Sequence, residues 1–207
     1  FTVTSKDGAP DFANKSVTVN PTSGSTVSVD FGKATYTKDG EYKYTVKETK
    51  GSIGGIDYDE TEYTVTVSVV DNGDGTLTAT NSYKAGTDTK TAIGFANTYD
   101  AKGKANLSVK KALSTGATPV DGTYEFQLIE NGKDKQTKSN VGENVTFDTI
   151  NYTLKDVGTH TYTIHESSTA AKGWTNGADV TVVVNVEDNK DGTLNFTYGT
   201  DKADTFT

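Results

Sequence analysis

The sequence predicts an all-β protein made of two tandem copies of one sandwich-like or barrel-like domain. In many short segments apolar or aromatic residues alternate with polar ones, a period that is typical of half-buried strands. Turn residues separate these segments, and the 207 residues include 21 Gly. The pattern of the first half returns in the second, so each copy has roughly a hundred residues, an ordinary domain size.

The clearest repeated element is the segment 41–48, which returns as the segment 159–166. In both copies the alternation places a carboxylate on the apolar face, Glu48 in the first and Glu166 in the second. The two residues lie in register, 118 positions apart (166 − 48). An unpaired buried carboxylate costs folding free energy, so we expect a Glu at this position to have a partner or a function.

The remaining elements follow the same repeat. In the first copy we expect strands at 1–4, 17–19, 27–31, 63–69, 77–79 and 93–99. In the second we expect them at 107–113, 124–128, 145–147, 180–186, 194–198 and 205–207. The turns 71–76 and 188–193 each close a hairpin, because they contain the dipeptide steps that favour one. The predicted domains are 1–99 and 100–207, and residues 100–104 read as a polar linker.

Composition excludes some function classes. The net charge is −8 and all 20 basic residues are Lys, which argues against nucleic-acid binding. The chain has no Cys, so it is either intracellular or reinforced by something other than disulfides. No apolar run is long enough to predict a membrane span. The chain contains no Met and starts with Phe1, so we expect it to be a segment of a longer protein.

Several motifs recur together across both halves. They are Tyr44-Thr-Val-Lys-Glu48, Tyr63-Thr-Val-Thr-Val67, the segment 71–79 and Phe95-Ala-Asn-Thr-Tyr99, then Val109-Lys-Lys-Ala-Leu113, Tyr162-Thr-Ile-His-Glu166 and Asn189-Lys-Asp-Gly-Thr-Leu194. With these motifs the sequence resembles the isopeptide-linkage domains of Gram-positive pilins and surface adhesins. The resemblance implies immunoglobulin-like (CnaB-type) β-sandwiches. It also implies a bond between a Lys on the first strand and an Asn on the last, assisted by a buried acid.

Carried over by position, the resemblance assigns Glu48 and Glu166 as catalytic acids, Lys111 as the nucleophile of the second domain and Asn97 as the acceptor of the first. Apolar burial favours the neutral amine, which is the nucleophilic form. A protonated Glu can donate a hydrogen bond to the Asn carbonyl and carry protons as ammonia leaves. Since the fold supplies proximity, we expect no cofactor and no activity as an enzyme on other substrates.

Neither domain carries the full triad of Lys, Glu and Asn at the positions that the resemblance assigns. Lys111 lies 15 residues before Phe126 (126 − 111), so the matching Lys of the first domain is expected before Phe1. The matching Asn of the second domain is expected directly after Thr207. Trimming at both ends explains this pattern. Alternatively, the missing first strand comes from another molecule, because a sandwich without that strand exposes unpaired backbone.

Each site residue also has an ordinary structural explanation. Lys111 on an edge strand would extend its amine to water, and Glu48 and Glu166 at strand ends would reach solvent. Asn97 would then be a turn residue.

Other motifs give weaker evidence of a functional site. The acidic spacing of the turn 71–76 is wrong for a calcium loop. His160 and His165 lie on opposite faces of one strand without a third ligand, so no metal site is predicted. Trp174 is expected to pack in the core.

The leading hypothesis is a structural one: part of a pilus shaft or adhesin stalk on the cell wall, outside a Gram-positive cell, with neighbouring pilin or adhesin domains as partners. One alternative is an adhesin module that binds a host-surface ligand through the loops 9–26 or 81–90. Another is a split domain that captures a strand from a second chain. No nucleic acid and no membrane is expected as a partner of this segment.

Overall fold

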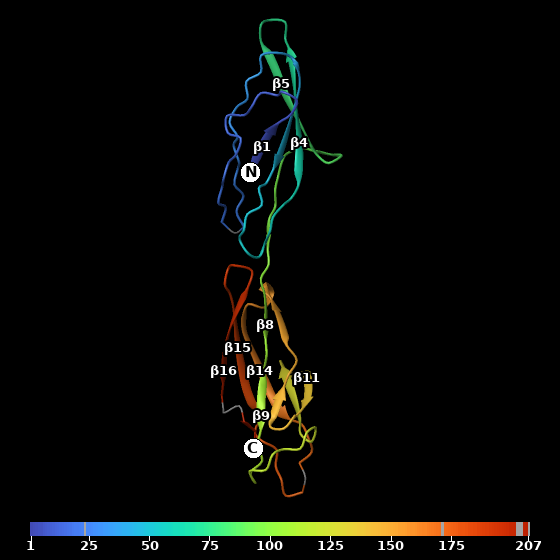
Figure 1. Ribbon diagram of the computed structural model, residues 1–207, viewed down its shortest axis with the longest axis vertical. Coiled ribbons are helices and arrows are strands. Elements are labelled where there is room, and N and C mark those ends of the chain that lie inside the picture. The colour runs from blue at the N-terminus through green and yellow to red at the C-terminus, as the bar shows by residue number, and fades with distance from the viewer. Residues whose placement is uncertain (23, 171, 202–204, 207) are drawn as a thin grey trace. The chain divides into compact units, whose positions relative to one another are not determined.

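The computed structural model describes the chain except for residues 23, 171, 202–204 and 207, and describes 205 and 206 without their side chains (Figure 1). The all-β prediction is confirmed: within these residues the single helical element is the 3₁₀ turn η1 (Leu154–Asp156). No described helix is long and apolar enough to cross a membrane. The chain forms two compact units: unit 1 is Phe1–Ser52 with Asp57–Thr98, and unit 2 is Ile53–Ile56 with Tyr99–Thr207.

Unit 1 is built on one five-stranded antiparallel sheet in the order β1-β2-β4-β5-β6. Its strands are β1 (Thr2–Ser5), β2 (Gly40–Lys47), β4 (Glu62–Asp71), β5 (Leu77–Ala85) and β6 (Asp88–Lys90). The two-residue strands β3 (Ile56–Asp57) and β7 (Thr98–Tyr99) fall where the chain divides between the units. Alternate residues of β2 and β4 supply most of the core, because every second side chain faces the same side of a sheet.

The expected strands 17–19 and 27–31 of unit 1 are absent, and the expected strand 93–99 is reduced to β7. No strand is assigned in the described residues of 17–39, and Val27 is 44% exposed. The segment 93–97 also lacks a strand. Alternation predicts which side chains share a face, but a strand also needs a hydrogen-bonded neighbour. Residues of the segments 26–31 and 93–95 instead line the groove described below.

Unit 2 has a five-stranded sheet in the order β11-β10-β14-β15-β16, a three-stranded sheet in the order β12-β9-β17, and the pair β13-β8. The first comprises β10 (Glu125–Glu130), β11 (Lys133–Ser139), β14 (Gly158–Glu166), β15 (Val180–Asp188) and β16 (Leu194–Thr200). The others are β8 (Lys102–Ala105), β9 (Ser108–Lys111), β12 (Asn144–Thr146), β13 (Ile150–Thr153) and β17 (Thr205–Phe206). Buried side chains from both groups of strands form one core.

The polar linker predicted at 100–104 is wrong, because β8 occupies most of it and pairs with β13 (Figure 1). Its inward positions hold small residues: Ala105 is buried, and a Cβ at Gly103 would lie 2.6 Å from the Phe196 ring. Small side chains give a weak hydrophobic signal, so the alternation was hidden.

Both predicted hairpins are confirmed. β4 pairs with β5 across the turn 71–76, and β15 pairs with β16 across the turn 188–193. In each turn the Asn N–H donates to the Thr carbonyl four residues on, at 3.0 Å in unit 1 and 3.1 Å in unit 2. The repeated sequence therefore builds the same local structure twice.

Candidate functional site

A buried ion pair lies at the centre of unit 2. Alternation along β9 turns Val109 and Lys111 inward, and β14 ends with Glu166 on the core side. Lys111 Nζ lies 3.1 Å from each Glu166 carboxylate oxygen. Lys111 is 3% exposed and Glu166 1%. The edge-strand explanation of Lys111 is wrong, because β9 lies between β12 and β17.

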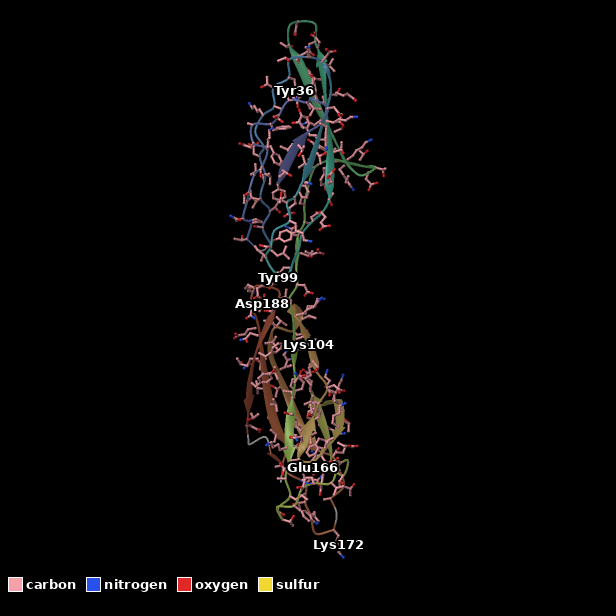
Figure 2. All side chains as sticks on the ribbon, viewed as in Figure 1. Tyr36, Tyr99, Lys104, Glu166, Lys172 and Asp188 are labelled. Atoms are coloured by element: carbon pink, nitrogen blue, oxygen red, sulfur yellow. The ribbon has the colours of Figure 1, made fainter. Side chains whose placement is uncertain are left out.

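The loop after β14 holds the Glu166 carboxylate in place. Gly177 N–H donates to Glu166 Oε2 at 2.9 Å. Asn176 Nδ2 donates to the carbonyls of Glu166 and Ser168, at 2.9 and 2.6 Å, and so ties the loop to the strand end. Figure 2 shows Glu166 at the end of unit 2 from which the loop carrying Lys172 extends.

An aromatic ring covers the amine. The Tyr124 ring centroid lies 4.9 Å from Lys111 Nζ, which is within cation–π range. Tyr124 is fixed in turn by Asn140, whose Oδ1 accepts the Tyr124 N–H at 2.9 Å. A Lys amine is a nucleophile only in its neutral form, and the Glu166 carboxylate at 3.1 Å is the group placed to take its proton.

The last described strand runs beside the nucleophile. β17 pairs in parallel with β9, with Phe206 opposite Lys111. Thr207, directly after which the sequence predicts the second acceptor Asn, lies outside the described residues.

Unit 1 brings the other two predicted residues together. Asn97 Nδ2 donates to Glu48 Oε1 at 2.8 Å, and Asn97 Oδ1 accepts the Asp59 N–H at 2.8 Å. A backbone N–H can only donate, so the amide oxygen must face Asp59 and the amide nitrogen must face Glu48. This differs from the expectation that the acid contacts the Asn carbonyl. The other oxygen, Glu48 Oε2, is buried and accepts no hydrogen bond from any described residue.

A groove of about 470 Å³ opens in unit 1. Its apolar lining includes Val29, Val46 and Phe95. By the sequence repeat, Val29 corresponds to Val145 in β12 and Phe95 to Phe206 in β17. In unit 2 these two strands flank β9. The groove therefore lies between the segments that match the neighbours of the Lys-bearing strand.

Sequence reasoning missed Asp59 and Gly177. One signal was available: Asp59 lies 11 residues after Glu48 (59 − 48), and Gly177 lies 11 after Glu166 (177 − 166). The residue types differ, because the shared group is the backbone N–H. Periodicity of side chains cannot detect it.

The remaining candidates have structural partners. His160 Nδ1 lies 3.2 Å from Glu130 Oε1, and its Nε2 lies 2.7 Å from the Asp156 carbonyl. Among the described residues no three His, Asp or Glu side chains are grouped to hold a metal ion. The core prediction for Trp174 is wrong, since the residue is 44% exposed.

The fold and these contacts define a class: tandem β-sandwich domains that hold a Lys amine, or an Asn amide, against a partly or fully buried carboxylate. The chain belongs to the FctA family, described as the Spy0128-like isopeptide containing domain, whose profile matches residues 1–100 and 107–207. The prediction of two tandem immunoglobulin-like β-sandwiches of the pilin isopeptide type is thereby confirmed.

The chain is similar to several pilins. A pilin from Streptococcus pyogenes serotype M1 is 36% identical over 107 residues, which cover 50% of this chain and 29% of that relative. The matched region thus spans less than a third of the relative. Two solved structures match with a TM-score of 0.37 each. The major pilin T-13 from S. pyogenes serotype GAS131465 is 22% identical, with 99% of this chain and 85% of that one covered. A second S. pyogenes major pilin is 23% identical, with 99% and 88% covered.

Proposed function

We propose that this chain is a structural segment of a pilus shaft or adhesin stalk on the surface of a Gram-positive cell, stiffened by intramolecular Lys–Asn isopeptide bonds. The observation that carries the proposal is the buried Lys111–Glu166 pair, which places a potential nucleophile beside a proton acceptor. Membership of the isopeptide-domain family and the similarity to a pilin support it. Neighbouring pilin or adhesin domains would be its partners.

In unit 2 the reaction begins when Lys111 passes a proton to Glu166 across their 3.1 Å contact. The neutral amine then attacks the side-chain carbonyl of an Asn placed directly after Thr207. The new C–N bond forms and the C–NH₂ bond breaks. The departing nitrogen gains two protons, one returned by Glu166 and one given up by the attacking amine, whose nitrogen keeps a single hydrogen in the new amide. The products are an amide and ammonium, so protons and charge balance without a cofactor.

Such a bond would join β9 to the chain just beyond β17, the last strand of the unit. Like a disulfide, it would remove conformational freedom from the unfolded chain and so stabilise the folded one. It would need no oxidising compartment, which agrees with a chain that contains no Cys. A stalk held under force by strand-to-strand bonds would resist separation of those strands.

The test for unit 2 is the intact mass of a chain extended past Thr207 by an Asn and several further residues. We expect a mass one ammonia below that of the sequence. Lys111→Arg and Glu166→Ala should each restore that ammonia. The control is Lys110→Arg, the exposed neighbour on the same strand, which should keep the deficit. A full mass in the unsubstituted extended chain would refute the proposal for unit 2.

The groove supports a second candidate function, the capture of a Lys-bearing strand by unit 1. The strand would occupy the place that β9 holds in unit 2, opposite Val29 and beside Phe95. Its Lys would then meet Glu48 Oε2, the buried oxygen without a described partner. The bond would form with Asn97. In a longer chain the same groove would take a strand of the same molecule.

The test for unit 1 uses the synthetic peptide Leu-Ser-Val-Lys-Lys-Ala-Leu, the sequence of residues 107–113. Incubated with the 207-residue chain, it should give an adduct whose mass is the sum of the two less one ammonia. Asn97→Ala should give none, and neither should a peptide with Arg in place of its second Lys. An adduct that persists in Asn97→Ala would place the chemistry elsewhere.

A further inference from the structure

We propose that the backbone N–H of Asp59 is the oxyanion donor for bond formation at Asn97, and that the Asp59 carboxylate positions it; this inference rests on the proposed function of unit 1. The Asp59 N–H lies 2.8 Å from Asn97 Oδ1, the oxygen that gains negative charge when an amine attacks. A preorganised donor at that oxygen stabilises the tetrahedral intermediate.

The Asp59 side chain holds this donor in place. Asp59 Oδ2 accepts the Ala96 N–H at 2.9 Å, and Oδ1 accepts the Thr61 N–H at 2.9 Å. Asp59 therefore contacts the residue before the acceptor through its carboxylate and the acceptor itself through its backbone. Two contacts on successive residues fix the Asn97 amide more closely than either would alone.

The orientation of the Asn97 amide gives its two contacts, with the Asp59 N–H and with Glu48 Oε1, different roles. The carbonyl oxygen faces Asp59, so the carbonyl carbon is polarised by a fixed backbone N–H. The amide nitrogen faces Glu48 Oε1 at 2.8 Å, so Glu48 is placed to protonate the leaving group. The incoming amine, which arrives as ammonium, supplies both protons that the departing nitrogen needs. One passes through Glu48 and the other is given up as the new C–N bond forms, so the nitrogen departs as ammonium.

Unit 2 gives an independent sign that this N–H belongs to the site. Gly177 lies 11 residues after Glu166 (177 − 166), as Asp59 lies 11 after Glu48 (59 − 48), and its N–H donates to Glu166 Oε2 at 2.9 Å. In each unit a backbone N–H from the loop after the acid thus points into the reaction centre. In unit 1 it contacts the acceptor amide, and in unit 2 it contacts the acid.

The decisive variant replaces Asp59 with its α-hydroxy-acid counterpart, which keeps the carboxylate and exchanges the backbone N–H for an ester oxygen. In the peptide-capture reaction we expect the rate at saturating peptide to fall about 100-fold or more, as when one oxyanion donor is lost. The peptide concentration for half-maximal rate should stay unchanged, because the groove is intact. The same ester at Glu60, one residue further on, is the matched control and should retain the full rate.

Asp59→Ala tests the carboxylate separately. It keeps the N–H but loses the contacts to Ala96 and Thr61, so the rate at saturation should fall less than in the ester variant. Equal rates in the Asp59 and Glu60 esters would overturn this inference alone. No adduct in the unsubstituted chain would overturn the proposed capture function and this inference with it.

Discussion

Lys111 Nζ lies 3.1 Å from each carboxylate oxygen of Glu166, and both side chains are almost entirely withdrawn from solvent. Lys and Glu are seldom buried unless they are paired. Replacing a buried ion pair by apolar residues is often neutral or stabilising, so such a pair is weak evidence for a role in stability alone. Its geometry instead suits proton transfer between an amine and a carboxylate.

Removal of the cation should destabilise unit 2. Lys111→Met leaves Glu166 buried without its partner, and we expect the free energy of unfolding to fall by about 3–5 kcal/mol. Urea unfolding followed by the fluorescence of Trp174, the one Trp of the chain, reports on unit 2. The exposed Lys110→Met is the control. A loss below about 1 kcal/mol in Lys111→Met would show that the pair is not isolated from water.

Gly103 should not tolerate a side chain. A Cβ there would lie 2.6 Å from two Phe196 ring carbons and 2.9 Å from Leu194 Cβ, so the core must shift. We expect Gly103→Ala to cost about 1–3 kcal/mol of unit 2 stability, measured by the same urea unfolding. Phe196→Leu should recover part of this loss. Gly199→Ala, where no atom lies within 4 Å of the added Cβ, is the matched control.

Two hydroxyl groups in the core should contribute to stability together. Tyr152 and Tyr162 share a hydrogen bond of 2.7 Å and are both buried. Tyr162→Phe leaves the Tyr152 hydroxyl without this partner and should cost about 1–3 kcal/mol of the free energy of unfolding. The double change of both Tyr to Phe should cost less than the sum of the single changes. Exposed Tyr198→Phe serves as the control, and additive losses would argue against the coupling.

Acid should weaken unit 1 through Asp59. The Thr61 hydroxyl, the Ala96 N–H and the Thr61 N–H hold the pKa of Asp59 below its ordinary value. Because the folded pKa is lowered, the carboxylate stabilises unit 1 above the unfolded pKa of about 3.9, and this is lost as pH falls through the folded pKa. Asp59→Asn should therefore lower stability at pH 7 and change it little near pH ~2. Urea unfolding at both pH values, with Asp57→Asn as control, checks the sign. An equal loss at both would contradict it.

The sequence was sufficient for the parts of the fold that depend on alternation and turn chemistry. It located β4 and β15, their hairpins, and the inward placement of Lys111 and Glu166, because a period of two marks the buried face of a strand. It failed at β8, where Gly and Ala conceal the apolar face. It also failed at 17–19 and 27–31, where alternation occurs but the backbone makes only isolated hydrogen bonds to a neighbouring segment, such as Val17 with Phe1. Those outcomes depend on contacts distant in the chain.

In the candidate site the identity of the side chains was predictable, whereas their orientation and burial were not. Glu48 and Asn97 could be named because the resemblance assigns side chains by position. The orientation of the Asn97 amide could not, since the backbone N–H of Asp59 decides it and sequence motifs describe side chains only. The buried and unpaired state of Glu48 Oε2 likewise follows from packing.

The most direct test of the self-linking account is the intact mass of one chain that carries a Lys-bearing strand before Phe1 and an Asn after Thr207. The account predicts a mass two ammonia molecules below that of its sequence, and Glu48→Ala and Glu166→Ala should each restore one. A mass equal to that of the plain sequence would contradict the account, because the carboxylates would then hold amine and amide together without joining them.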